Sequence, residues 1–154
     1  MRVIAATNSV DDIEALKLLA FEWMDEWNGK AFGIDLRLET HLQDLTRLIE
    51  NEDSELFLLI KMDRVIGYMG CTCFDSPLGN QKICQEHYWF VSGKNRGRGA
   101  LLLLRAVKKW AKDKNCSHLI MNCSNLASDL HDRLCRFYEK IGYMKFETSY
   151  IKEL

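Results

Sequence analysis

The fold is decided by the stretch Val91-Ser92-Gly93-Lys94-Asn95-Arg96-Gly97-Arg98-Gly99-Ala100, which runs directly into Leu101-Leu102-Leu103-Leu104. It joins an apolar strand to a helix through a basic, glycine-rich turn. Glycines let the backbone approach a ligand closely, and the free amides and positive dipole end at the start of a helix favour phosphate. Arg96 and Arg98 add positive charge at the same point. The stretch therefore predicts an anion-binding site between a strand and a helix.

Two common phosphate loops do not fit this turn. A nucleoside-triphosphate loop ends in Gly-Lys followed by Ser or Thr, and no such tripeptide occurs in the sequence. A dinucleotide loop needs a third glycine where Leu102 stands.

The turn instead resembles the acetyl-CoA pyrophosphate loop of the GCN5-related N-acetyltransferase (GNAT) superfamily. The usual form of that loop is Gln/Arg-x-x-Gly-x-Gly/Ala after a strand that ends in Val, and Lys94, Gly97 and Gly99 occupy those positions. Arg96 precedes the first glycine, as is common in the superfamily. The departures are Lys94 in place of Gln or Arg, Gly93 where proline is frequent, and Leu101 where another glycine often stands.

A second motif strengthens the resemblance. The sequence Phe137-Tyr138-Glu139-Lys140-Ile141-Gly142-Tyr143 is similar to the superfamily's helix-to-strand motif, in which the tyrosine lies near the CoA sulfur. The Asn-x-x-Ala that often precedes this tyrosine is replaced, with His131 and Leu134 at those positions. Asn122 and Asn125 are left open as sources of an equivalent amide.

The resemblance covers nearly the whole chain and implies one α/β domain over residues 1–154. The expected fold is GNAT-like, with a mixed, mostly antiparallel central sheet flanked by helices. The implied activity is direct transfer of an acetyl group from acetyl-CoA, the acetyl-donor co-substrate, to a primary amine in a ternary complex. Backbone amides near the end of the third hairpin strand would stabilise the oxyanion, and Tyr138 would protonate the departing thiolate. The implied co-substrate-binding residues are Phe90, Val91, Lys94, Arg96, Gly97, Arg98, Gly99 and Ala100.

The general base has two candidates, Glu86 and His87, on the strand that borders the substrate. Adjacent strand residues point to opposite faces, so we expect only one of them to face the cleft. A histidine titrates near neutrality without adjustment, whereas a glutamate needs burial or a water relay. The sequence does not choose between them.

Periodicity and turn residues predict ten elements in the order β-α-α-β-β-β-α-β-α-β. Capping signals begin the two early helices, at Ser9 with Asp12 and at Thr40 with Gln43. Only twelve residues follow Gly142, so one final strand is expected in place of the usual hairpin. The predicted strands are 2–7, 55–61, 65–74, 83–91, 118–123 and 143–151, and the later helices are 98–114 and 128–141. Three aromatic residues are candidates either for the acceptor pocket or for ordinary core, namely Trp23, Trp27 and Phe32.

Charge is divided unevenly along the chain. Residues 1–60 hold five basic and thirteen acidic residues, a net charge of -8, whereas residues 93–114 hold eight basic residues and one acidic residue, a net charge of +7. The basic helix would receive the CoA phosphates and the acidic half would attract a cationic amine. Beyond its first turn, the basic helix is equally well explained as an ordinary solvated helix face. Nucleic acid is a weaker explanation, because a whole-chain pI near 6.4 offers no general attraction to phosphate.

Composition predicts a compact protein in a reducing compartment. The 154 residues are 47% hydrophobic and 28% charged, and no run approaches the roughly 18 apolar residues of a membrane span. We therefore expect no membrane contact and a cytoplasmic location. The six cysteines include no Cys-x-x-Cys pair, which favours free, buried thiols over disulfides or a metal site, and no metal is expected.

Several alternatives stay open at this level. The acceptor is a small amine, a protein N-terminus or lysine, or an aminated nucleotide. A non-catalytic acyl-CoA-binding module and a nucleobase-modifying enzyme on the same fold are the rival functions. Homodimers are common among such folds, but the sequence does not specify a dimer surface.

Overall fold

A computed structural model describes residues 1–126, 130–152 and 154, apart from the side chain of Lys94. The strands are β1 (Arg2–Ala5), β2 (Ser54–Lys61), β3 (Arg64–Asp75), β4 (Lys82–Val91) and β5 (His118–Ile120). The helices are α1 (Val10–Glu26), α2 (Leu38–Glu50), α3 (Arg98–Asp113) and α4 (His131–Lys140), with short 3₁₀ turns η1 (Gly29–Phe32) and η2 (Gly93–Asn95).

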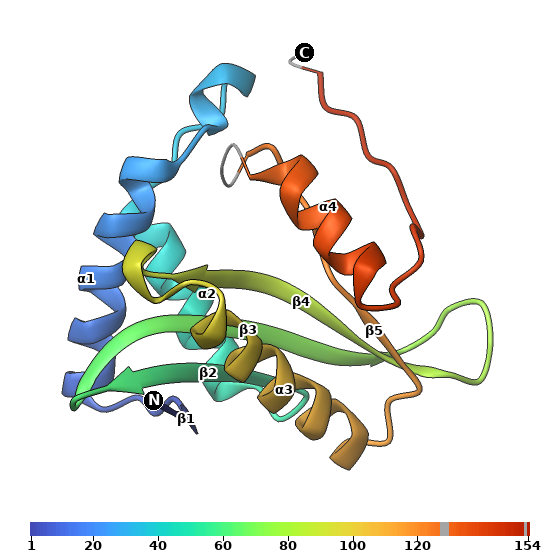
Figure 1. Ribbon diagram of the computed structural model, residues 1–154, viewed down its shortest axis with the longest axis horizontal. Helices are drawn as coiled ribbons and strands as arrows, with labels where there is room; N and C mark the ends of the chain where they lie inside the picture. The colour runs from blue at the N-terminus through green and yellow to red at the C-terminus, as the bar shows by residue number, and fades with distance from the viewer. Residues whose placement is uncertain (127–129, 153) are drawn as a thin grey trace.

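The five strands form one sheet in the order β1-β2-β3-β4-β5. The first four strands pair antiparallel, whereas β5 pairs parallel to β4. Helices cover both faces, with α1 and α2 behind the sheet and α3 and α4 in front (Figure 1). The expected α/β fold with a mixed sheet is thus confirmed.

Each face of the sheet has its own apolar core. Behind the sheet, α1 and α2 contribute Leu16 and Leu45 to a cluster with Tyr68 and Phe90. In front, α3 contributes Leu103 and Val107 to a second cluster. The strands contribute the apolar residues Phe57, Leu59, Met69, Cys71, Cys84 and Val91 to it. The alternation of strand side chains between two buried faces explains why β2 reads as a nearly continuous apolar run.

The predicted start of the first early helix is confirmed and that of the second is wrong. The Ser9 hydroxyl accepts a hydrogen bond from the Asp12 amide at 3.2 Å, which caps α1. The helix α2 begins at Leu38, before the predicted Thr40 cap, and its N-cap Arg37 makes no side-chain cap bond. The Arg37 carbonyl already accepts from the His41 amide at 3.0 Å, so Thr40 and Gln43 lie inside the helix.

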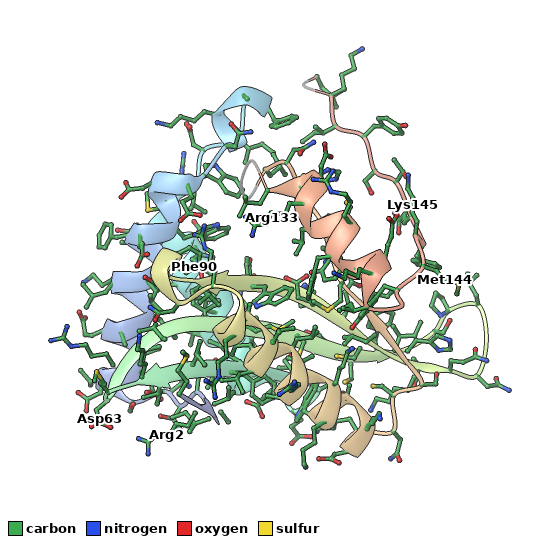
Figure 2. The ribbon with its side chains drawn as sticks, viewed as in Figure 1. Arg2, Asp63, Phe90, Arg133, Met144 and Lys145 are labelled. Carbon is green, nitrogen blue, oxygen red and sulfur yellow. The ribbon has the colours of Figure 1, made fainter. Side chains whose placement is uncertain are left out.

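The predicted strand 143–151 is absent from the part of the chain that the structure describes, where residues 143–152 have no regular secondary structure. Beyond Tyr143 their apolar side chains are not covered, since Met144 is 91% and Tyr150 is 95% exposed. Met144 and Lys145 lie on the outer side of this segment (Figure 2). Without a buried face the segment gains too little to hold a strand.

Two other boundaries differ from the prediction. Strand β5 ends at Ile120 and does not reach 123, because its pairing with β4 stops at Gln85. Within the described residues α4 begins at His131, and the predicted start at 128 lies outside them. No helix among the described residues is both long and apolar enough to cross a membrane.

Candidate active site

The basic turn lies between the end of β4 and the start of α3, as the sequence predicts. Gly97 is the N-cap of α3 with φ 81°, and no side chain among those that the structure describes caps this helix. Its carbonyl accepts from the Leu101 amide at 3.0 Å, which is the first helical hydrogen bond. The amides of Arg98, Gly99 and Ala100 therefore lack partners within the helix and are available to an anion.

The two glycines of the turn have different roles. A Cβ on Gly97 would meet nothing within 4 Å, so its requirement is the positive φ. A Cβ on Gly99 would lie 2.7 Å from Leu59 Cδ2, so its requirement is close packing of α3 on β2. The loop conformation therefore requires Gly97, whereas helix packing requires Gly99.

The two arginines of the turn point to different surroundings. Arg98 is exposed at the first position of α3. Arg96 donates from Nε to the Val91 carbonyl at 2.9 Å, forms an ion pair with Glu26 at the end of α1, and stands 5.9 Å from the Phe90 ring centroid. Phe90 lies where β4 approaches the start of α3 (Figure 2). Arg96 is thus tied to β4 and α1, while Arg98 is the arginine free to meet a ligand.

The strands β4 and β5 separate at Glu86. Their parallel pairing covers only Ile83 to Gln85. On the other side of β4 the register with β3 shifts at Gly70 and Cys71, which makes His87 the extra residue of a bulge. Beyond Gln85, among the described residues, no strand pairs with the β5 side of β4, so alternate backbone groups up to Val91 have no strand partner on that edge.

Glu86 is buried at this separation. Asn122, just beyond β5, donates from its amide to Glu86 Oε2 at 3.0 Å and from its side chain to the Glu86 carbonyl at 2.5 Å. Burial raises the pKa of Glu86 to about 7, and the hydrogen bond from the Asn122 amide opposes this rise. A carboxyl of this pKa can accept a proton near neutral pH. Asn125, in contrast, accepts a hydrogen bond through its carbonyl from Asn28 at 3.1 Å.

His87 lies on the other face of the sheet, toward α2. Its Nε2 is 3.1 Å from Thr72 Oγ1, and the charge of Asp44 in α2 partly offsets the lowering of the His87 pKa by burial. The two base candidates thus point apart, as strand alternation predicts.

Beside Glu86, three aromatic polar groups are buried without a partner. Among the described residues, Trp89 Nε1, Tyr138 OH and Tyr143 OH make no hydrogen bond. The Trp89 and Tyr138 rings stack with centroids 6.1 Å apart, and the Tyr138 and Tyr143 centroids are 5.5 Å apart. Burial, and next the charge of Glu86, raises the pKa of Tyr138 well above its usual value, so the phenol stays protonated. Buried unpaired donors are costly, which indicates that a ligand completes them.

Sequence reasoning named Tyr138 but missed Trp89. Simple alternation places residues 86 and 89 on opposite faces, and the bulge at His87 reverses this. Nothing in the residue letters marks that bulge.

A hollow of about 420 Å³ lies on the opposite side of the sheet, and Trp23, Trp27 and Tyr88 are among its lining residues. Phe32, the third predicted pocket aromatic, lines a separate hollow with Gly33 and Ile151. Two of the three aromatic candidates therefore meet at one cavity.

Among the residues that the structure describes, no three His, Cys, Asp or Glu side chains gather as a metal site would require.

Comparison with known proteins agrees with the fold. The sequence model of the acetyltransferase (GNAT) family matches residues 15–143. A tetramutant of the BH1408 protein from Bacillus halodurans is 18% identical, with a TM-score of 0.79 and all of both chains covered. Aminoglycoside N-acetyltransferase AAC(6')-Iy, solved in complex with CoA, is 15% identical, with a TM-score of 0.75 over 99% of this chain and 93% of its own. A ribosomal-protein-alanine N-acetyltransferase from Brucella melitensis is 15% identical, with a TM-score of 0.72 over all of both chains. None of the curated protein sequences compared with this chain matches it.

Proposed function

The chain belongs to the acetyltransferase (GNAT) family and is an acyltransferase, and from this premise we propose that it transfers an acetyl group from acetyl-CoA to a small primary amine by direct attack. The proposal includes one catalytic domain over residues 1–154. The chemistry of the site's side chains supports this direct attack.

The observation that carries the proposal is the set of unpartnered buried donors beside a buried carboxyl. Trp89, Tyr138 and Tyr143 each present an N–H or O–H without an acceptor, and Glu86 acts on the pKa of Tyr138. The carbonyl and sulfur of a CoA thioester are acceptors of the kind these groups lack. The residues present therefore fit the co-substrate.

The co-substrate would be held at two places. The amides of residues 98–100, the side chain of Arg98 and the predicted Lys94 would bind its pyrophosphate. Of the backbone amides predicted for this role, at Phe90 and Val91, the one on the β5 side of β4 would donate to the thioester oxygen and to the oxyanion that develops there, because adjacent strand amides face opposite edges. When bound, acetyl-CoA supplies the activated acetyl group.

The protons are moved by two side chains. Glu86 accepts a proton from the attacking amine, directly or through water, because its pKa of about 7 keeps a large part of it ionised at neutral pH. Tyr138 stays protonated because its pKa is raised, so its hydroxyl is available to donate a hydrogen bond, and then its proton, to the departing sulfur. His87 faces α2 and takes no part in this transfer.

Calorimetric titration with acetyl-CoA, with CoA, ATP and NAD as comparators, tests the co-substrate. Selective micromolar binding of the two CoA compounds is expected, followed by release of free thiol when primary amines are added. Folded protein that binds no CoA compound would overturn the proposal. Tight binding without transfer to any amine would make the chain an acyl-CoA-binding module.

A further inference from the structure

The hollow behind β4 has an aromatic wall. It is contributed by α1, α2 and β4, through Trp23, Trp27, His41 and Tyr88. The Trp23 ring centroid lies 5.4 Å from that of Trp27, 4.7 Å from that of His41 and 6.1 Å from that of Tyr88, and several of these pairs meet edge to face. His41 and Tyr88 are 4.8 Å apart by the same measure. Such a wall offers ring faces to a flat or apolar group and to a cation.

The aromatic wall itself carries no positive charge at neutral pH, although Arg37 and Arg47 line other parts of the hollow. Burial lowers the pKa of His41 to about 4, and its Nε2 is 2.9 Å from the Tyr68 hydroxyl. The imidazole is therefore neutral and does not repel a cation held against the neighbouring rings.

A carboxylate stands beside the rings. The Tyr88 hydroxyl donates to Asp44 Oδ2 at 2.5 Å, which fixes the carboxylate against the aromatic wall. Arg47 also approaches Asp44 Oδ1, at 3.7 Å, but its side chain is 75% exposed. An exposed pair at this distance is weak, so an ammonium group can displace the arginine from the carboxylate.

We propose that this hollow binds an organic ammonium ion with a flat, apolar body, of the arylalkylamine class. The inference goes beyond the proposed function, because the hollow lies on the side of the sheet opposite Glu86 and Tyr138. The rings hold the body of the ligand by contact and its ammonium group by cation–π attraction, and Asp44 adds the opposite charge. The charged residues that line the hollow balance, with Asp35 and Asp44 against Arg37 and Arg47, so the preference for a cation rests on the ring faces and on the carboxylate that Tyr88 holds beside them.

The chemistry is tested with four matched probes, by quenching of tryptophan fluorescence and by calorimetry. The probes are 2-phenylethylamine, 2-phenylethanol, 3-phenylpropanoate and phenylalanine, which share a ring and differ in charge. The amine is expected to bind at least 10-fold more tightly than each of the other three. Equal binding of the alcohol, or tighter binding of the propanoate or of phenylalanine, would overturn the assignment.

Two variants locate the binding. Asp44→Asn keeps a hydrogen-bond acceptor for Tyr88 and removes the charge, and we expect at least 10-fold weaker binding of 2-phenylethylamine. Glu39→Gln removes one charge from the same helix outside the hollow and is expected to change nothing. Unchanged affinity in Asp44→Asn would refute the role of Asp44.

The same protein samples separate this inference from the proposed function. Titration with acetyl-CoA should give equal affinity in the wild type, Asp44→Asn and Glu39→Gln. If acetyl-CoA binds and 2-phenylethylamine does not, the ligand class of the hollow is wrong and the proposed function stands. If the amine binds at Asp44 and acetyl-CoA does not, the hollow is an amine site in a protein of another function.

Discussion

At the scale of single residues, Glu86 is the group whose protonation should control the rate. Burial raises its pKa to about 7, so the proposed base is increasingly protonated, and unable to accept a proton, as the pH falls below that value. We expect kcat/KM for the amine to rise with pH, with a midpoint near 7 in addition to the titration of the amine itself.

Glu86→Gln tests this assignment. It should lower kcat by roughly 10²–10⁴-fold and remove the limb near pH 7, while His87→Gln keeps that limb. The measurement is a rate series from pH 5.5 to about 9 on the three proteins. A limb that persists in Glu86→Gln and disappears in His87→Gln would assign the base to the other face of the sheet.

Substitution of Tyr138 should lower turnover without lowering stability or acetyl-CoA affinity. Its hydroxyl is buried without a partner, so Tyr138→Phe removes an unsatisfied group and should leave the melting temperature unchanged or higher. Turnover should fall about 100-fold or more, with little change in acetyl-CoA affinity. Tyr143→Phe is the control, because it removes another unpartnered hydroxyl from the same cluster. Similar turnover in the two variants would reduce Tyr138 to a packing residue.

At the scale of elements, the role of the turn before α3 in binding acetyl-CoA should be tested by a substitution that does not disturb packing. Gly99 fails this condition, because a Cβ there would meet Leu59 at 2.7 Å, and Gly97 fails because of its positive φ. Arg98 is exposed at the start of the helix, so Arg98→Glu reverses a charge beside the free amides without a packing change.

We expect Arg98→Glu to weaken acetyl-CoA binding at least 10-fold in calorimetry. Lys112→Glu makes the same charge change 14 residues further along α3, roughly 21 Å away, and should have a small effect. Equal losses in the two variants would mean that the whole basic face, and not the turn, attracts the nucleotide.

The sequence predicted the elements whose signals are local. Alternating apolar residues indicated β2, β3 and β4 to within a residue at each end, and Ser9 indicated the start of α1. The final strand was mispredicted, because its apolar residues suggest a strand but only tertiary packing could bury them. The bulge at His87 depends on how β3 pairs with β4, so the site role of Trp89 had no local signal.

At the scale of the whole molecule, two buried groups give opposite pH dependences of stability. The pKa of Glu86 rises from 4.5 to about 7 on folding, so its contribution is present below pH 4.5 and is lost as the pH rises through 7. The pKa of His41 falls from 6.5 to about 4, so its contribution is present above pH 6.5 and is lost as the pH falls through 4. Each effect amounts to about 3 kcal/mol, so the two largely cancel in the wild type.

Single substitutions should reveal the pH dependence that each of the two groups gives to stability. The free energy of unfolding of Glu86→Gln should rise between pH 4 and 6.5, whereas that of His41→Asn should fall between pH 4.5 and 7. Urea unfolding across this range, with the wild type as reference, measures both slopes. Parallel curves for the two variants would contradict the opposite burial effects.

The ion pair between Arg96 and Glu26 links the turn before α3 to the amine hollow. It ties the turn before α3 to the end of α1, the helix that supplies Trp23 to the amine hollow. Both side chains are about one-third exposed, so dissolved salt reaches the pair and weakens it. Salt should therefore loosen the end of α1, and the affinity of the hollow for 2-phenylethylamine, measured by calorimetry, should fall as the ionic strength rises.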